Sequence, residues 1–395
     1  MSEDLSHQLE LLLSESYESV IERAYSSFDR MAAPVADSVV LFGAGGMGRR
    51  TLAGLRSLGI PPVAFSDNNP DLWNTVVDGI PVLSPEAAAL DYGDHSVFLV
   101  TILHVESGHP VAQVEAQLNR IRPVRVISVG YLYWKYPSVF GPYFFLDSPG
   151  KVIEQADQVS RALDLWADET SRAEYVAQIR NRLWLDWEQL PPGAPDQYFP
   201  SDLPSMVGPD TGEVFVDCGA FDGDTIRMYL ERRGDGFAQI HAFEPDPVNF
   251  ALLSAFREAL PPTVAKRIDV LQAAVSGQSG TVSFDASGSD QSRMGVGGAT
   301  EVPCVALDDV LKTGTSMYIK MDVEGAEFDA LCGAGQIIKK GLPRLAVCVY
   351  HTVDHLWRIP NLLASMSSEY SFYLRRHRNA GWETVCYAVH RESRR

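Results

Sequence analysis

Residues 214–225 read VFVDCGAFDGDT, and this stretch decides how the second half of the chain is expected to fold. An apolar run typical of a buried strand ends at Asp217, and Gly219 and Gly223 follow in the turn that opens the next helix. Glycine adopts the backbone conformations that such a tight strand–turn–helix connection requires. Asp224 belongs to the acidic residues of the same turn. The pattern predicts a parallel α/β sheet with a ligand site at this turn.

A second glycine turn lies earlier, in residues 39–50, VVLFGAGGMGRR. It fits the G-x-G-x-x-G pattern, in which glycines let the backbone approach a pyrophosphate and the helix N-terminus offers free N–H groups. Residues 38–66 contain no Asp or Glu, so a bound anion would meet no nearby negative charge. The same glycines would also serve tight strand–helix packing with nothing bound. The candidate nucleotide-binding residues are Gly43, Gly45, Gly46, Gly48 and Asp67, the last of which follows the next strand, where a ribose-binding carboxylate would stand.

Length and composition restrict the classes of protein to consider. At 395 residues, with 46% hydrophobic and 21% charged residues, the chain is expected to form two globular domains and a connector. The net charge of −18 disfavours nucleic acid and anionic membranes as partners. The start, MSEDLSHQLE, does not resemble a signal peptide, and no apolar run is long enough to predict a membrane span. The 5 cysteines lack a CxxC pair, which fits reduced thiols in the cytoplasm and no structural zinc.

Alternating strand and helix patterns organise most of the chain. Residues 3–25 show helical spacing of apolar side chains, and we expect this helix to dock on its own domain; a dimer helix is the alternative. Residues 151–190 predict two helices broken near DETS, with Ser171 and Glu174 as a capping box for the second. The expected parts are an N-terminal helix in 1–36, a nucleotide-binding domain in 37–136, a helical connector and lid in 137–212, and a second α/β domain in 213–395.

The two glycine turns predict ligands of opposite charge. S-adenosylmethionine presents a sulfonium and an ammonium but no phosphate, so a turn with Asp217, Asp222 and Asp224 suits it and would repel a pyrophosphate. Glu244 ends the next strand, in IHAFEPDP, where a carboxylate can accept hydrogen bonds from both ribose hydroxyls. The alternative explanation is a structural turn with a solvated cluster of acids.

Residues 213–390 resemble the FkbM family of S-adenosylmethionine-dependent methyltransferases. The matching segments are EVFVDCGAFDGDT, AFEPDP, LQAAVS, VALDDVL, YIKMDVEGAEFDAL and VYHTVDHLWRIPNLLASMSSEYSFYLRRH, and DQYFP (196–200) precedes them. The resemblance implies a seven-stranded class I methyltransferase fold. It also implies an enzyme that methylates a hydroxyl of a small molecule or sugar. The expected fold class is therefore α/β, with two Rossmann-like doubly wound sheets joined by a helical connector. The candidate cofactor-binding residues are Asp217, Gly219, Ala220, Gly223, Asp224, Thr225, Glu244, Asp246, Ala273 and Asp322.

The front domain carries a resemblance of its own. Residues 42–86, from FGAGGMGRR to VLSPE, are similar to the small front domain of sugar O- and N-acyltransferases of bacterial glycan assembly. That resemblance implies a nucleotide or nucleotide-sugar as the ligand of this domain, rather than a redox cofactor.

The residues expected to carry the chemistry follow two strands. Methyl transfer needs an in-line approach of the acceptor oxygen, and a base assists a poorly nucleophilic hydroxyl. Asp322 and Glu324 follow the strand MYIKM, and His351 ends LAVCVYH at the same edge of the sheet. We expect His351 to act as the base, with Asp322 as the alternative base or the residue that orients the acceptor. Glu324 and Glu327 are better explained as acids at a helix start.

Other residues leave alternatives open. Asp322, Glu324, His351 and His355 also offer metal ligands, but two histidines four residues apart equally form one helix face, and no metal site is predicted.

Two polar residues and one lysine have weaker assignments. Ser292 and Arg293 lie in the loop SGSDQSRMGVGG, which could cover the acceptor. Lys320 is expected to be a structural ion-pair partner.

The sequence thus favours a two-domain cytoplasmic O-methyltransferase that acts on a small molecule, sugar or glycan precursor, either alone or as a homo-oligomer. Two other functions compete with it. One is an NAD(P)-dependent oxidoreductase that uses residues 43–48, and the other is a non-catalytic module that binds a nucleotide or S-adenosylmethionine.

Overall fold

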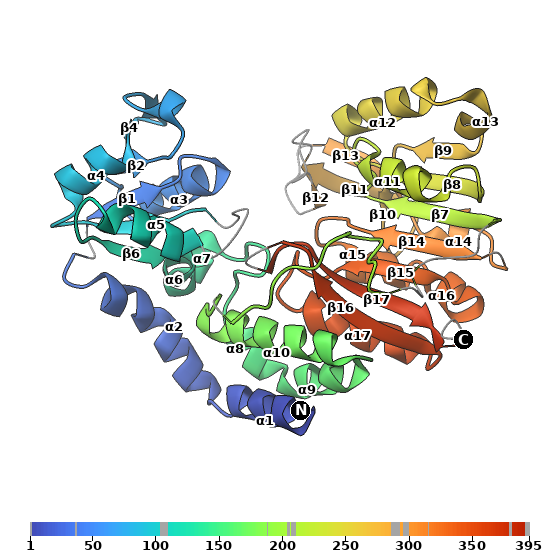
Figure 1. The fold of residues 1–395 in the computed structure, drawn as a ribbon, viewed down its shortest axis with the longest axis horizontal. Helices are drawn as coiled ribbons and strands as arrows, with labels where there is room; N and C mark the ends of the chain where they lie inside the picture. The colour runs from blue at the N-terminus through green and yellow to red at the C-terminus, as the bar shows by residue number, and fades with distance from the viewer. Residues whose placement is uncertain are drawn as a thin grey trace.

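Two α/β units lie side by side in the computed structural model and are joined along one edge by helices (Figure 1). The structure describes residues 2–35, 38–102, 110–187, 189–203, 206, 211–285, 293–294, 300–314, 316–378 and 381–391. Ser292 lies outside the described residues, and of Arg293 only the backbone is described.

The front unit is built on a six-stranded sheet with the order β3-β4-β2-β1-β5-β6. All neighbouring pairs are parallel except β3–β4. The chain reverses direction across the sheet between β1 and β5, and the first glycine turn follows β1 at this point. The elements are β1 (Val39–Phe42), α3 (Gly46–Ser57), β2 (Ala64–Ser66), the 3-10 helix η1 (Pro70–Leu72), β3 (Val76–Val77), β4 (Ile80–Leu83), α4 (Pro85–Tyr92), β5 (Val97–Val100), α5 (Pro110–Asn119) and β6 (Arg125–Ser128).

The four strands predicted for the front unit are confirmed as β1, β2, β5 and β6. The hairpin β3–β4 was not predicted, although its two turn residues, Asp78 and Gly79, carry a recognisable signal. Both have positive φ (48° and 81°), and Asp-Gly is a favoured pair for a two-residue hairpin turn.

Two N-terminal helices replace the single helix predicted over residues 3–25. They are α1 (Ser2–Leu13) and α2 (Tyr17–Ala32), and Ser16 between them accepts a hydrogen bond from the backbone N–H of Ser19 at 3.2 Å. The prediction was wrong because apolar spacing continues through the break, whereas the serine cap starts a new helix. α1 packs on the connector helices, and Figure 1 shows α2 rising from there to the front unit.

After α6 (Val129–Lys135), which ends the front unit, the described part of the connector forms the helices α7 (Pro137–Phe140), α8 (Gly150–Glu154), α9 (Ala156–Leu165) and α10 (Glu169–Trp184). The predicted break near DETS is confirmed, but the predicted capping box is wrong. Asp168 caps α10 by accepting the Ser171 backbone N–H at 2.8 Å. Glu174 instead pairs with Arg376 of the second unit at 2.9 Å. A buried cation from another unit outweighs the local capping preference here.

The second unit contains a seven-stranded sheet with the order β16-β17-β15-β14-β7-β8-β9, of which only the β15–β17 and β16–β17 pairs are antiparallel. From β7 the chain moves outward to β9 and later resumes at β14 on the other side of β7, so the switch point lies between β7 and β14. The strands are β7 (Glu213–Cys218), β8 (Phe237–Phe243), β9 (Ile268–Leu271), β14 (Met317–Met321), β15 (Arg344–Cys348), β16 (Tyr370–Arg376) and β17 (Thr384–His390).

Both faces of this sheet are buried. Val214 and Val216 of β7 lie in one apolar cluster, and Phe215 between them lies in the other. A parallel sheet covered on both faces accounts for the nearly continuous apolar strands of the sequence. Its helices are α11 (Asp224–Arg233), α12 (Pro247–Ala259), α13 (Pro262–Ala265), α14 (Leu307–Val310), α15 (Glu327–Cys332), α16 (Gly335–Gly341) and α17 (His355–Met366). A small sheet, β10-β13-β11-β12, adjoins it and is formed by β10 (Ala274–Val275), β11 (Gly280–Asp285), β12 (Arg293–Met294) and β13 (Thr300–Val305).

A row of aromatic rings links the two units. Tyr133 of α6 contacts Tyr143, with ring centroids 6.3 Å apart. Tyr143 contacts Phe144 at 4.8 Å, and Phe144 contacts Trp382 beside β17 at 4.6 Å. We call these four rings the aromatic bridge. One apolar cluster accordingly extends from β1 of the front unit to β7 of the second. Among the described residues, none of the helices has the length and apolar character needed to cross a bilayer.

Candidate active site

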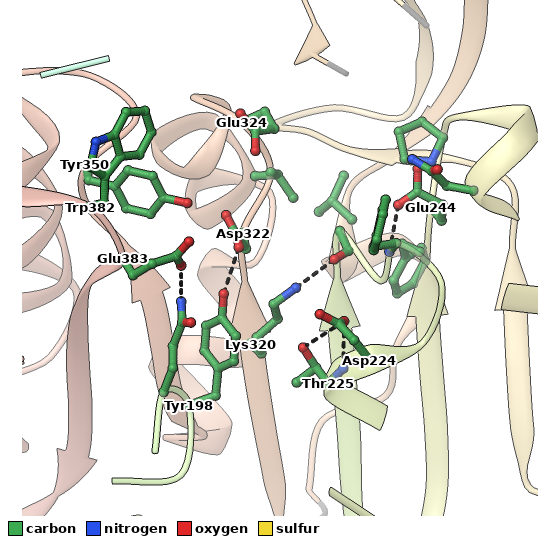
Figure 2. A pocket seen from close by; sticks show the side chains of 18 of the residues that line it. Tyr198, Asp224, Thr225, Glu244, Lys320, Asp322, Glu324, Tyr350, Trp382 and Glu383 are labelled. Atoms are coloured by element: carbon green, nitrogen blue, oxygen red, sulfur yellow. Dashed lines mark hydrogen bonds between the residues drawn. The ribbon is translucent and has the colours of Figure 1, made fainter. Parts of the chain in front are cut away.

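A cavity of about 560 Å³ lies at the carboxyl ends of β7, β8, β9 and β14, where the sheet order places a ligand site. Its wall comes from three parts of the chain. The front unit contributes Gly46 and Met47, the second unit contributes most of the wall, and the connector contributes Tyr143, Phe144, Gln197 and Tyr198. Figure 2 shows the polar side chains of the second unit that face this space.

Gly219 lets the first turn pass tightly under the switch point. Its φ is +80°, and a Cβ at this position would lie 1.8 Å from the backbone oxygen of Asp322. No other residue type fits without moving the end of β14. The predicted need for glycine at this position is therefore a matter of contact with the neighbouring strand as well as of turn geometry.

Asp217, at the end of β7, is buried beneath the cavity beside Lys320 of β14. The Lys320 Nζ atom lies 3.0 Å from Asp217 Oδ1 and donates a hydrogen bond to the Gly219 carbonyl at 2.6 Å. Burial raises the pKa of Asp217 to about 6, although Lys320 opposes the shift. Burial would lower the pKa of Lys320, but Asp217, Asp322 and Asp224 reverse this and raise it above its ordinary value. The predicted ion-pair role of Lys320 is confirmed.

Glu244 follows β8 and turns into the cavity. Its Oε2 accepts the backbone N–H of Phe221 and its Oε1 that of Asp246, both at 2.9 Å (Figure 2 draws the first). Burial raises the pKa of Glu244 to about 7, against the effect of these backbone donors. Each oxygen keeps a second lone pair, so the carboxylate remains able to accept hydrogen bonds from a ligand.

The other expected cofactor residues divide into two groups. Asp246 caps α12 by accepting the backbone N–H groups of Val248 at 2.8 Å and Asn249 at 3.3 Å, which is a structural role. It is not part of the cavity wall, and neither are Asp217, Ala220 and Gly223. Those that do line the cavity are Gly219, Asp224, Thr225, Glu244, Ala273 and Asp322.

The two predicted catalytic residues meet in one cluster with two glutamates. His351 Nε2 lies 3.3 Å from Asp322 Oδ1 and 3.4 Å from Glu324 Oε1. On the other side of the ring, His351 Nδ1 hydrogen bonds to Glu327 Oε1 at 2.7 Å. Glu324 has a left-handed φ of +52°, an unusual conformation for a residue with a side chain. We call Asp322, Glu324 and His351 the acid–imidazole cluster.

The charges in this cluster support one another. Burial opposes the charge on His351, but Glu327 and Glu324 more than offset it and raise the pKa of the imidazole well above its ordinary value. Burial likewise opposes the charge on Glu327, but His351 and His355 lower its pKa below the ordinary value. Burial raises the pKa of Glu324. Glu327 begins α15, as expected for an acid at a helix start, but it also fixes the imidazole.

His355, expected as part of the same group, points elsewhere. Its Nδ1 lies 3.0 Å from Glu327 Oε2, on the far side of that carboxylate. Among the described residues, the one group of three or more such side chains whose ligand atoms all lie within 4.8 Å of one another is Asp322, Glu324 and His351.

Several cavity residues were missed in the sequence. The Tyr198 hydroxyl donates to Asp322 Oδ2 at 2.7 Å, while Tyr318 donates to the Tyr198 carbonyl and Gln197 to Glu383. Tyr198 lies in DQYFP, inside a proline-rich stretch with no periodic pattern, so only the family resemblance of that segment gave a signal. Tyr350 and Trp382 also line the cavity.

The front glycine turn opens toward the same cavity. Gly43 has a φ of +112°, and a Cβ on Gly48 would lie 2.0 Å from the Gly43 carbonyl oxygen, so both glycines serve strand–helix packing. Asp67 accepts the backbone N–H of Ala44 at 2.7 Å and that of Asn69 at 2.8 Å. Both oxygens of the expected ribose-binding carboxylate therefore already have backbone partners.

Comparisons with known proteins agree with this architecture. A crystal structure of methyltransferase FkbM from Methylobacillus flagellatus aligns with a TM-score of 0.74 and 20% identity, over 96% of this chain and 100% of that one. Precorrin-6y C5,15-methyltransferase from Geobacter metallireducens is 12% identical over 50% of this chain and 92% of that one, with a TM-score of 0.31. UDP-D-quinovosamine 4-dehydrogenase from Vibrio fischeri is 26% identical over 23% of this chain and 75% of that one, with a TM-score of 0.18.

The last two TM-scores are too low to support an argument, and the first likeness shows that the fold is shared across nearly the whole chain. No curated protein matches the sequence. Residues 217–374 match the family described as the methyltransferase FkbM domain, and this segment contains the acidic turn, Glu244, Asp322 and His351. The second unit therefore matches, over residues 217–374, the model of the methyltransferase FkbM domain.

Proposed function

We propose that the protein transfers a methyl group from S-adenosylmethionine to a hydroxyl oxygen of a small molecule, sugar or glycan precursor. The observation that carries this proposal is the convergence of Glu244, Asp224 and Asp322 on one cavity of about 560 Å³ at the switch point of a methyltransferase sheet. Cavities of this size hold a cofactor-sized ligand.

The cavity wall suggests how the cofactor lies. Glu244 would accept hydrogen bonds from the ribose hydroxyls, and the adenine would lie near Ala273, at the end of β9. The positively charged methionine end would lie over the acidic turn, near Asp224. Figure 2 supports this direction, because Glu244 and Asp322 lie on opposite sides of the drawn pocket with Asp224 between and below them.

The transfer step requires a base. The acceptor oxygen forms a bond to the methyl carbon while the bond from that carbon to sulfur breaks, and the electron pair stays on sulfur to give S-adenosylhomocysteine. We assign the hydroxyl proton to Asp322, whose Oδ1 is buried without a hydrogen bond among the described residues. His351 is held by Glu327 at Nδ1 and lies 3.3 Å from Asp322 Oδ1 at Nε2, so we assign it to orient Asp322 rather than to act as the base.

The front unit would bind the part of the acceptor remote from the methylated hydroxyl. Gly46 and Met47, at the start of α3, line the same cavity as Asp322. The N-terminus of a helix attracts anions, so a nucleotide-linked sugar would have its phosphates here and its sugar toward the second unit. This arrangement supports an acceptor-binding role for the front turn over an oxidoreductase role.

The experiment is calorimetry with the purified chain, followed by incubation with S-adenosylmethionine and a panel of nucleotide sugars. We expect micromolar binding of S-adenosylhomocysteine and formation of that product only with an acceptor, both measured by mass spectrometry of the mixture. The Asp322→Asn variant should keep cofactor binding and lose turnover by at least 100-fold, because a general base contributes about 10²–10⁴-fold. Binding of NAD in place of S-adenosylhomocysteine would overturn the proposal, and cofactor binding with undiminished turnover in Asp322→Asn would overturn the assignment of the base.

A further inference from the structure

We propose that the acid–imidazole cluster binds one divalent transition-metal ion, through Asp322 Oδ1, Glu324 Oε1 and His351 Nε2. The inference rests on the proposed methyltransferase function only for its role, because the ion would bind whether or not a methyl group is transferred. It assigns a resident cation to the point where two carboxylates of the cavity wall face a buried imidazole behind them.

The first support is an unsatisfied atom. The His351 side chain is 1% exposed, and its Nε2 points at the two carboxylates without forming a hydrogen bond among the described residues. Asp322 Oδ1 is buried and lacks a hydrogen bond in the same way. Buried polar atoms are rarely left without a partner, and here two such atoms face one another across 3.3 Å.

The second support is the spacing of the candidate ligand atoms. The two distances from His351 Nε2, 3.3 Å and 3.4 Å, are too long for strong charge-assisted hydrogen bonds. They match the separation of neighbouring ligands around one ion, since bonds of about 2.1 Å at tetrahedral or octahedral angles leave ligand atoms about 3.0–3.4 Å apart. All three ligand atoms lie within 4.8 Å of one another.

The third support is the partner on the opposite side of the ring. Glu327 Oε1 holds His351 Nδ1 at 2.7 Å. This carboxylate–histidine pair fixes the Nδ1–H tautomer and directs the Nε2 lone pair into the cluster, which is the usual second-shell arrangement of a metal-bound histidine. The left-handed φ of Glu324 turns its carboxylate toward the same point, and Gly325 with a φ of +101° follows it.

The ligand set determines the class of ion. Two carboxylates and one imidazole suit Mn²⁺ or Fe²⁺ better than Ca²⁺, which prefers oxygen alone, or a structural zinc, which takes four protein ligands. Three protein ligands leave positions open, and Asp322 and Glu324 line the cavity, so these positions face the acceptor.

In this arrangement the acceptor hydroxyl would bind the ion, which lowers the pKa of the hydroxyl. Asp322 is then a ligand of the ion, so Glu383, whose carboxylate lies beside Asp322 in Figure 2, replaces it as the acceptor of the hydroxyl proton. The oxygen–methyl bond forms and the methyl–sulfur bond breaks as before, with the electron pair on sulfur.

The test measures Mn²⁺ binding to the full chain after a chelator has removed any bound ion. Electron paramagnetic resonance detects the Mn²⁺ that remains free and so gives the amount bound. We expect one Mn²⁺ per chain, with affinity at least tenfold weaker in Asp322→Asn and His351→Gln. Glu327→Gln should weaken binding about 10–100-fold, because it leaves the ligands in place and removes only their support. The matched control is His241→Gln, which alters another histidine beside a carboxylate, 3.3 Å from Asp269 and outside the cavity wall.

Thermal unfolding in the presence of Mn²⁺ provides a second readout, because an ion that binds only the folded chain raises its melting temperature. We expect this rise in the wild type and in His241→Gln, and not in Glu324→Gln, a half-buried position at which folding is less at risk. Absence of Mn²⁺ binding to the folded wild type at 1 mM (about the weakest specific site), or equal binding by the cluster variants, would overturn the proposal.

Cofactor binding separates the two proposals. If S-adenosylhomocysteine binds and Mn²⁺ does not, the cation site is refuted and the methyltransferase function stands. If Mn²⁺ binds and S-adenosylhomocysteine does not, the cation site stands and the methyltransferase function is refuted.

Discussion

Glu244 is the residue at which burial and ligand binding compete most directly. Its pKa of about 7 places its ionisation in the pH range of ordinary assays. Only the ionised carboxylate can accept hydrogen bonds at both oxygens from a ribose while keeping its two backbone donors. Cofactor affinity should therefore depend on this single group near neutral pH.

We predict that affinity for S-adenosylhomocysteine rises with pH up to about 7 and then levels off, with a slope of at most about tenfold per pH unit. The sign for stability is the opposite. The folded chain holds this proton more tightly than the unfolded chain, whose value is near 4.5, so the contribution of Glu244 to the free energy of unfolding falls between pH 4.5 and about 7. Calorimetry at pH 5.5 to 8.5 measures the first effect, and a pH-independent affinity would contradict it.

Replacement of the same residue gives a second prediction. Glu244→Gln should weaken cofactor binding about tenfold to 100-fold, because a hydrogen bond to a charged group contributes about 1.5–3 kcal/mol. The pH dependence should disappear in this variant. Glu258→Gln, on the exposed side of α12, is the control and should match the wild type in both respects.

Lys320 should be essential for folding rather than for chemistry. Lys320→Met leaves the Asp217 carboxylate buried without its cation, and we predict a loss of about 3–5 kcal/mol in the free energy of unfolding, measured with urea. The double variant Asp217→Asn with Lys320→Met should recover part of this loss. A loss below about 1 kcal/mol in the single variant would mean that Lys320 does not compensate the buried charge of Asp217.

At this scale the sequence predicted much of the site. Asp217, Glu244, Asp322 and His351 each follow a strand, so their common edge could be deduced from strand order alone. The hydrogen bond from Tyr198 to Asp322 and the one between Glu327 and His351 could not, because each depends on how two loops pack after the sheet has formed.

At the scale of elements, the turn between β7 and α11 determines whether the site can form. Gly219 and Gly212 have nearly the same φ, +80° and +81°, but a Cβ at Gly219 would meet the Asp322 oxygen at 1.8 Å, whereas none of the described atoms lies within 4 Å at Gly212. Substitutions at the two glycines therefore distinguish two effects, the strain of a left-handed backbone and a steric clash with the end of β14.

We predict that Gly212→Ala loses only the strain of a left-handed alanine, about 1–2 kcal/mol, and keeps cofactor binding. Gly219→Ala should lose more stability and should also fail to bind S-adenosylhomocysteine, because the end of β14 and the residues after it, which line the cavity through Lys320 and Val323, must move. Urea unfolding and calorimetry on both variants measure the contrast. Equal effects of the two substitutions would show that the contact with β14 is unimportant.

The strands β1, β2, β5 and β6 of the front sheet were predicted from their apolar runs, whereas the short hairpin β3–β4 was not. The N-terminal helices and the cap of α10 were predicted less well, because local propensity was opposed by other contacts. Ser16 interrupts an otherwise continuous apolar face, and Glu174 leaves its expected box to pair with Arg376.

At the scale of the whole molecule, the cavity belongs to both units. We predict that Met47→Trp reduces kcat/KM for a bulky acceptor by at least tenfold while affinity for S-adenosylhomocysteine stays within about twofold, because Met47 lines the wall contributed by the front unit. The control is Leu90→Trp, at an exposed position of α4 in the same unit. Steady-state kinetics should place the effect in the acceptor KM, and a matching loss of cofactor affinity would contradict the division of roles.

This shared wall could not be predicted from the sequence. Each glycine turn is readable by itself, but their convergence on one cavity depends on the path of the connector and on side-chain packing between residues far apart in the chain. Tyr143 and Phe144 lie in the segment predicted as connector and lid, and their place in the cavity wall depends on this packing.

The aromatic bridge bears on regioselectivity. Since the rings from Tyr133 to Trp382 hold the two units at one spacing, a substrate anchored at α3 presents to Asp322 only the hydroxyl that lies at the matching reach. In this arrangement the protein would select one of the chemically similar hydroxyls of a sugar by its distance from the anchored end of the substrate. Replacement of a ring in the aromatic bridge would then move methylation to a neighbouring hydroxyl rather than abolish it.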